Sequence, residues 1–219
     1  MHKFSLIEPE RWMKLLQRWI YVQDKYSWVN WFAPIWADIF VIIYPIFLVT
    51  LYLYAIIKKT VKEKQWALYI FFSTFFAVLL NIWVQCFFIK ERPIVALNTL
   101  DMEETLLHEI LPVSSFPSDH SVVWMCFAVA TLLWGRYSKK SWMKYSWCAL
   151  ILVSFIMSWC RMLTLVHWPT DILAWYFIGI IVPCILMIPC IRNILLSFII
   201  NPIIKFEKFI VKKCFNYKQ

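Results

Sequence analysis

The chain has 219 residues, of which 62% are apolar or aromatic and only 16% are Asp, Glu, Lys or Arg. An average soluble domain has about 45–50% apolar and about 25% charged residues, so one core of this size cannot bury 14 Trp, 18 Phe and 10 Tyr with the other apolar side chains. The composition indicates an integral membrane protein, and the two glycines argue against a loop-rich or collagen-like chain.

The segment 1–37 mixes apolar and basic side chains. Its apolar residues recur at helical spacing among Arg11, Lys14 and Arg18, which predicts an amphipathic helix at the membrane interface. A helix packed on the membrane bundle would show the same pattern. We expect no secretory signal, because the first 30 residues contain no uninterrupted apolar stretch. The apolar positions are Leu6, Trp12, Leu15, Leu16, Trp19 and Ile20.

Apolar segments that can cross a bilayer follow, since a spanning helix needs about 20 residues. The third of them is short, but a helix that begins at Ser118 would be about 27 Å long at 1.5 Å per residue. The sequence therefore predicts an all-α membrane helix bundle of about five spans in one domain, 38–191, with a basic cytoplasmic tail at 192–219. The spans are predicted at 39–57, 66–89, 118–135, 145–162 and 172–191.

The charges of the connecting segments alternate along the chain. The segments 58–65, 136–144 and 192–219 hold 14 of the 22 basic residues, whereas 90–120 is acidic. Because cytoplasmic loops collect Lys and Arg, we expect a multi-pass protein of the cytoplasmic membrane with 90–120 and 161–171 on its outer face. The positions of the basic residues also argue against a nucleic-acid partner, although the formal net charge is +9. The oligomeric state remains open.

Polar residues gather at the predicted outer ends of the spans. Charged groups at membrane depth are costly, so their clustering is informative. The first cluster is Lys90 to Pro93, the second is Ser115 to Ser121, and the third contains Arg161, His167 and Asp171. The topology that apolar segments and loop charges predict, independently of these clusters, brings all three to one face.

The three clusters suit phosphoryl transfer. Arg92 and Arg161 offer planar forks of donors for phosphate oxygens. Ser118 opens a helix whose N-terminal N–H groups attract anions. Asp171 lies one helical turn beyond His167, so it can hold one imidazole nitrogen while the other attacks. His120 is then available as a general acid, and the set describes a phosphohistidine route that needs no metal or other cofactor.

Other interpretations exist for the single residues. An arginine at a helix end can be an interfacial anchor, and a lone histidine there is often only hydrogen-bonded. His120, His167 and Asp171 could form a two-His-one-carboxylate metal site, but two nearby guanidinium groups would repel a cation. The seven cysteines are scattered without a C-x-x-C pair, so we expect neither a disulfide framework nor a metal site from them.

These motifs resemble those of the type 2 phosphatidic acid phosphatase superfamily of membrane lipid phosphatases. Its signature is a Lys ahead of Arg-Pro, then Pro-Ser-Gly-His, and then an Arg followed at fixed spacing by His and Asp. Arg92-Pro93, Pro117 to His120, and Arg161 with His167 and Asp171 match in order and spacing.

The resemblance implies a role for each matching residue. It implies that His167 is the nucleophile, that Asp171 orients it, and that His120 protonates the leaving group. Asp119 stands where the family has Gly, so its backbone N–H faces the phosphate or its carboxylate binds Arg92. The implied phosphate-binding residues are Arg92, Ser118, Asp119 and Arg161.

Two departures from the signature indicate one branch of the superfamily. Gln85 replaces the first Lys, and Asp119 replaces the Gly. Phosphatases of undecaprenyl diphosphate of the bacitracin-resistance type share both features, and they carry an Asn that corresponds to Asn81. Ile94, Cys160 and Val166 depart from the usual residues of this branch.

The resemblance implies an activity. The enzyme would remove the terminal phosphate of undecaprenyl diphosphate and return undecaprenyl phosphate to cell-wall (peptidoglycan) synthesis. Its partners would be this lipid and the bilayer. Phosphatidylglycerophosphate, phosphatidic acid or lipid A phosphates remain alternative substrates, and a non-catalytic membrane protein of the same fold is an alternative from another class.

Overall fold

The structure is a computed structural model that describes residues 4–7, 9–97, 115–116, 118–139 and 142–216. The described chain is almost entirely helical, apart from two short parallel strands. The predicted acidic loop falls mostly in 98–114, outside the described residues. In order, the elements are β1 (Phe4–Ser5), α1 (Glu10–Lys25), α2 (Ser27–Ile57), α3 (Val61–Phe87), β2 (Phe88–Ile89), α4 (Pro93–Ala96), α5 (Asp119–Ser138), α6 (Trp142–Leu163), α7 (Pro169–Met187), α8 (Pro189–Ile194), a π-helical segment (Leu195–Ile200) and α9 (Asn201–Asn216).

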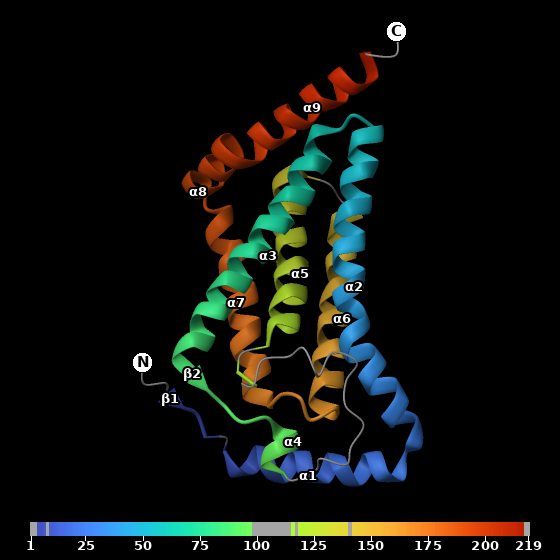
Figure 1. Cartoon of the computed structure of the whole chain (residues 1–219), viewed down its shortest axis with the longest axis vertical. Coiled ribbons are helices and arrows are strands. Elements are labelled where there is room, and N and C mark those ends of the chain that lie inside the picture. Colours follow the sequence, from blue (N-terminus) through green and yellow to red (C-terminus); the bar gives the residue numbers. More distant parts are fainter. Residues whose placement is uncertain (1–3, 8, 98–114, 117, 140–141, 217–219) are drawn as a thin grey trace.

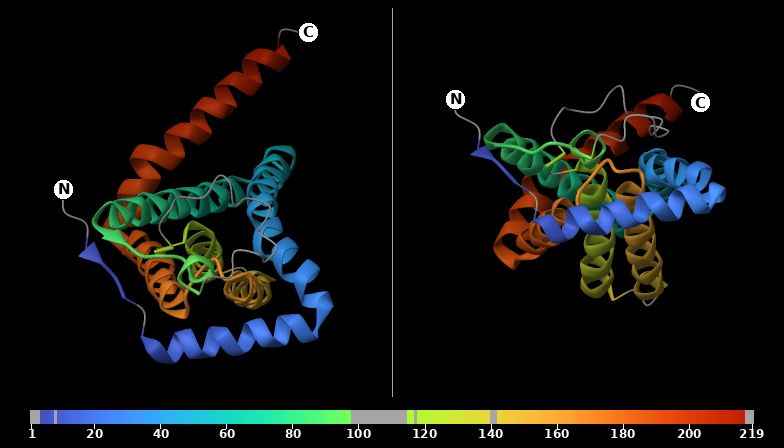
Figure 2. Two further views of the ribbon diagram at one scale, coloured as in Figure 1. Left: turned by 60° about the horizontal axis from the view of Figure 1, so that its bottom comes forward. Right: turned by 90° about the horizontal axis from the view of Figure 1, so that it is seen from below.

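The long helices form a bundle around α5 (Figure 1). Helix α5 packs against α3, α6 and α7, and α2 packs against α3 and α6. Helix α1 crosses one end of the bundle, whereas α9 runs obliquely from the opposite end (Figures 1 and 2). The prediction of an all-α membrane bundle is confirmed.

Four helices of the described chain are long and apolar enough to cross a membrane: Trp28–Ile57, Val61–Phe87, Ser146–Leu163 and Pro169–Met187. They correspond to four predicted spans, and the remaining one is α5. Helix α5 carries Asp119, His120 and Arg136, and most of its side chains are buried among its neighbours. It therefore lines the interior of the bundle instead of facing lipid.

Proline explains the end of the last span. The predicted span 172–191 ends earlier, because Pro189 cannot continue the helix and Ile188 before it is extended, with ψ of 131°. In α2, by contrast, Pro34 and Pro45 are accommodated inside one helix that begins at Ser27, well before the predicted start at 39.

The predicted amphipathic helix is α1, and it packs on the bundle. Its buried Leu16 belongs to a cluster with Ile94, Leu165 and Trp168, and Trp19 meets Trp159 edge to face at 4.5 Å. Leu6, which the helical spacing included, lies before the helix instead. Its N–H donates to the carbonyl of Ile89 at 3.0 Å, continuing the β1–β2 pairing.

Helix α9 exposes both aromatic and basic side chains. Phe206 and Phe209 are 65% and 64% exposed, while Lys208 stands between them in the sequence and further lysines lie on either side. The helix is tied to α3 by an ion pair between Glu207 and Lys64. A helix that shows both apolar and basic side chains suits the surface of an anionic membrane.

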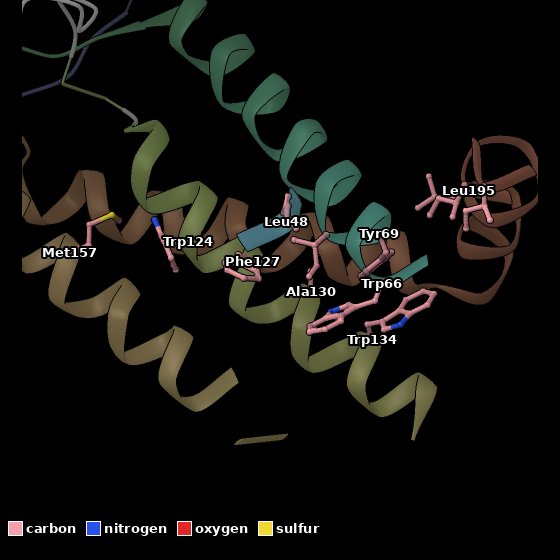
Figure 3. Close-up of a cluster of buried hydrophobic side chains, with 12 residues drawn as sticks. Leu48, Trp66, Tyr69, Trp124, Phe127, Ala130, Trp134, Met157 and Leu195 are labelled. Carbon is pink, nitrogen blue, oxygen red and sulfur yellow. The ribbon is translucent and has the colours of Figure 1, made fainter. Parts of the chain in front are cut away.

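The core fixes the helices at the end of the bundle away from α1. Leu48, Trp66, Tyr69, Phe127 and Trp134 pack together from α2, α3 and α5 (Figure 3). The rings of Tyr69 and Trp134 stack with centroids 5.3 Å apart, and the Tyr69 hydroxyl donates to the carbonyl of Pro183 at 2.7 Å.

One glycine sets the distance between α5 and α7. A Cβ at Gly179 would lie 2.9 Å from the Cβ of Met125 and 3.1 Å from the carbonyl oxygen of Val122. Both distances are too short for an ordinary contact, so only Gly permits this approach. The approach matters because α5 and α7 each begin at the polar end of the bundle.

Candidate active site

Six of the seven predicted site residues have described side chains, and all six are buried at the end of the bundle that α1 crosses (Figure 1). Ser118 is the N-cap of α5 and His120 lies in its first turn, Arg161 lies near the end of α6, and Asp171 lies in the first turn of α7. Arg92 precedes α4 and His167 lies between α6 and α7. The exposed fractions are Arg92 6%, Ser118 3%, His120 9%, Arg161 0%, His167 3% and Asp171 0%. The side chain of Asp119 is outside the described residues, although its backbone opens α5.

The imidazole of His167 is held by groups that define its protonation. Its Nδ1 lies 2.8 Å from the carbonyl oxygen of Ser115, and its Nε2 lies 3.2 Å from Nη2 of Arg161. A carbonyl can only accept and a guanidinium can only donate, so Nδ1 carries the proton and Nε2 carries the lone pair. The edge-to-face ring of Trp175, with centroids 4.7 Å apart, completes the pocket.

The environment of His167 keeps the ring neutral. Burial lowers the pKa of His167 well below its usual value of 6.5, and the positive charges of Arg161, Arg92 and Lys90 lower it further. The hydrogen bond to Ser115 opposes these effects. At neutral pH the Nε2 lone pair is therefore available, which is the state that a nucleophile requires.

The backbone joins the three motifs around His167. The N–H of Ser115 donates to the carbonyl of Lys90 at 2.8 Å, and the N–H of Ile94 donates to the carbonyl of Leu165 at 3.0 Å. Leu165 adopts a left-handed conformation with φ of 53°, which costs about 1–2 kcal/mol for a residue with a side chain. This strained turn carries the chain from α6 to His167.

The carboxylate of Asp171 lies closer to Lys90 and to the backbone of Trp168 than to His167. Its Oδ1 accepts from Nζ of Lys90 at 2.7 Å, and its Oδ2 accepts from the N–H of Trp168 at 2.9 Å. The distance from Oδ2 to Nδ1 of His167 is 3.8 Å, which exceeds a hydrogen bond. Asp171 is thus an electrostatic neighbour of the ring, because the Nδ1–H of His167 donates its hydrogen bond to the carbonyl of Ser115.

At the start of α5, Oγ of Ser118 and Nε2 of His120 are buried and have no hydrogen-bond partner among the described residues. Buried polar atoms are almost always paired in native proteins, so such a pair of atoms indicates a ligand that supplies the missing partners. The nearby guanidinium groups of Arg92 and Arg161 indicate that this ligand is an anion.

Sequence reasoning missed three contributors to the site. Asp38 of α2 binds Arg161 with 2.9 Å between Oδ1 and Nη1. The sequence does mark this residue, because Asp38 is the single charged residue between Tyr26 and Ile57, and a lone charge in an apolar helix indicates a functional role. Lys90 stood in a noted cluster without a role, and no pattern of side chains could reveal the carbonyl of Ser115. Within the described ranges, no three His, Cys, Asp or Glu residues gather as metal ligands.

A relative of known name shares part of this sequence. The protein "Putative undecaprenyl-diphosphatase YbjG" of Escherichia coli (strain K12) is 37% identical over 67 residues, which are 31% of this chain. The aligned region spans only 30% of the length of that relative. No solved structure matches the chain.

The family comparison covers more of the chain. The profile of the PAP2 superfamily matches residues 66–193, more than half of the sequence. The region includes all the predicted site residues, but it excludes Asp38. The resemblance that the three motifs predicted is confirmed, and this multi-pass membrane protein belongs to the PAP2 superfamily.

Proposed function

We propose that the protein hydrolyses the terminal phosphate of undecaprenyl diphosphate through a phosphohistidine intermediate on His167. The observation that carries the proposal is the position of Nε2 of His167, a buried lone pair 3.2 Å from the Arg161 guanidinium. The printed name of the E. coli relative supports the lipid diphosphate as substrate.

The reaction proceeds in two steps. The Nε2 lone pair of His167 attacks the terminal phosphorus, the bond from phosphorus to the bridging oxygen breaks, and His120 gives a proton to the leaving lipid phosphate. Neutral His120 then takes a proton from a water molecule that attacks the phosphohistidine. Inorganic phosphate leaves and Nε2 recovers its lone pair. Arg92, Ser118 and Arg161 hold the phosphate oxygens and stabilise their charge in each transition state.

The site is proposed to lie on the extracytoplasmic face of the cytoplasmic membrane. Lys58 and Lys59 follow α2 at the end of the bundle opposite the site, and α9 with its lysines begins at that end (Figure 1). Basic loops remain on the cytoplasmic side, which supports an outer position for the site. The product would there re-enter the cycle that carries cell-wall precursors.

Phosphate release by the purified protein in detergent tests this function. We expect release from undecaprenyl diphosphate that continues with a chelator present and stops with vanadate, which mimics the pentacoordinate phosphorus. Release from phosphatidylglycerophosphate or phosphatidic acid in preference to undecaprenyl diphosphate would contradict the proposed substrate. A folded protein that releases phosphate from none of these lipids would contradict the enzymatic function itself.

An apolar cavity beside the site suits the hydrocarbon chain of this substrate. It has a volume of about 320 Å³ and lies between α1, α6 and α7. Pro169 and Ile172 line it, and these residues flank Thr170 and Asp171 in the chain. The cavity is lined further by Trp12, Trp19, Trp159, Met162 and Leu173, among others.

Filling this cavity should weaken binding of the lipid chain. We expect Leu173→Trp to raise KM for undecaprenyl diphosphate about tenfold, the effect of losing roughly two buried methylene groups. Hydrolysis of p-nitrophenyl phosphate, which has no such chain, should stay unchanged. Leu152→Trp is the matched control, because Leu152 is 61% exposed and Leu173 is 62% exposed, yet Leu152 does not line the cavity. Equal KM values in the two variants would contradict this chain site.

A further inference from the structure

Asp38 is a buried carboxylate in the middle of an apolar helix. It is 3% exposed and belongs to α2, whereas the PAP2 match begins only at residue 66. A charge inside a membrane span is costly unless it is paired. Its position therefore calls for an account that the family motifs do not provide.

Asp38 holds one arm of the Arg161 guanidinium. Nη1 of Arg161 donates to Oδ1 of Asp38 at 2.9 Å and to the carbonyl of Ala37 at 3.4 Å. Nη2 lies 3.2 Å from Nε2 of His167. Helix α2 thus fixes one side of the planar group, so that its other side faces the nucleophile.

Asp38 also faces His120. Its Oδ1 lies 3.9 Å from Nε2 of His120, too far for a hydrogen bond but close enough for a strong charge interaction. Burial disfavours a positive His120 ring most, and the charged or titratable groups Arg161, His167 and Arg92 disfavour it further. A general acid must begin protonated, so one neighbour has to offset these charges. Among the described residues that face His120, Asp38 is the carboxylate that can do so.

We infer that Asp38 is a positioning residue of the phosphotransfer site, which orients Arg161 toward the phosphate and stabilises His120 in its protonated form. The inference rests on the proposed function and adds to it a residue from outside the family match. Asp38 itself touches neither the phosphorus nor the leaving oxygen. Its charge acts through Arg161 and His120.

Asp38→Asn tests the inference, because the amide keeps the size and an acceptor oxygen for Arg161 but removes the charge. We expect the rate with undecaprenyl diphosphate to fall by about 10²-fold, at the lower end of general acid catalysis. The alkaline limb of its pH profile should move about one pH unit lower, since His120 then loses its proton more easily. Hydrolysis of p-nitrophenyl phosphate, whose leaving group departs unprotonated, should fall less than about threefold.

Matched variants separate the possible results. Glu63→Gln neutralises another buried carboxylate, at the start of α3, and should leave the pH profile of wild type unchanged. Asp38→Glu keeps the charge, so its alkaline limb should stay at the wild-type pH even where its rate is lower. If the Asn variant does not fold, the Glu variant provides the test. A shift of the alkaline limb of its pH profile away from the wild-type pH would overturn the inference.

Two further outcomes for Asp38→Asn would also overturn it. One is an equal loss on both substrates with an unmoved pH profile, which would assign Asp38 a structural role alone. The other is no loss on either substrate. Absence of wild-type activity on all phosphates would instead contradict the proposed function, so the two failures are distinguishable.

Discussion

His167→Ala should lower phosphate release from undecaprenyl diphosphate by roughly 10⁴-fold or more, the scale of losing a catalytic nucleophile. The buried Nε2 lone pair is the attacking group in the proposed mechanism, and alanine offers no substitute for it. The variant should still insert and fold, because the substitution removes one hydrogen bond to Ser115 and one to Arg161 and leaves the packing of the spans in place. Phosphate release and thermal unfolding in detergent measure the two effects separately.

Labelling of the intermediate gives this prediction a second readout. Wild type that is quenched during turnover of terminally labelled substrate should carry a protein-bound label that is lost in acid and retained in alkali, as for a phosphorus–nitrogen bond. The Ala variant should carry none. Full activity in His167→Ala, or a label that resists acid, would exclude the phosphohistidine route.

Lys90→Met should destabilise the protein by about 3–5 kcal/mol, because it leaves a buried carboxylate without its cation. Lys90 and Asp171 are 4% and 0% exposed, and Nζ lies 2.7 Å from Oδ1. The variant should unfold at a clearly lower temperature than wild type. The double variant Lys90→Met/Asp171→Asn removes both charges and should recover part of this loss, which a thermal unfolding series in one detergent would show.

An exposed ion pair of the same type provides the control. Lys14 pairs with Glu10 at 2.8 Å, but their side chains are 68% and 78% exposed, and exposed pairs contribute about 0–1 kcal/mol. Lys14→Met should therefore unfold close to the wild-type temperature. If Lys90→Met unfolds at the same temperature as Lys14→Met, the buried pair does not stabilise the protein.

The sequence predicted the bundle because length and apolar composition suffice to define a spanning helix. It placed the start of α2 too late, since Pro34 and the polar residues near it resemble a helix boundary. In the structure the helix continues through Pro34 and Pro45. The curvature and exact extent of a membrane helix depend on its neighbours, which a single segment does not contain.

The candidate site was predictable where its residues form local patterns. Arg161, His167 and Asp171 lie within eleven residues of one another, so their spacing alone indicated a common site. Lys90 meets Asp171 across 81 positions, and Asp38 meets Arg161 across 123. Such pairs follow from how α2, α3 and α7 pack, and no local spacing encodes them.

The helices at the two ends of the bundle determine how deep the protein sits in the membrane. Helix α1 crosses the end that holds the site, and α9 leaves the other end with exposed Phe206 and Phe209 among its lysines. We expect both helices to lie along the two membrane surfaces, which limits the tilt of the spans and their movement along the membrane normal. The end that holds the candidate site then stays level with the lipid headgroups. The proposed lipid diphosphate could be cleaved there while its hydrocarbon chain remains in the bilayer, so that the protein would not have to lift this substrate into water.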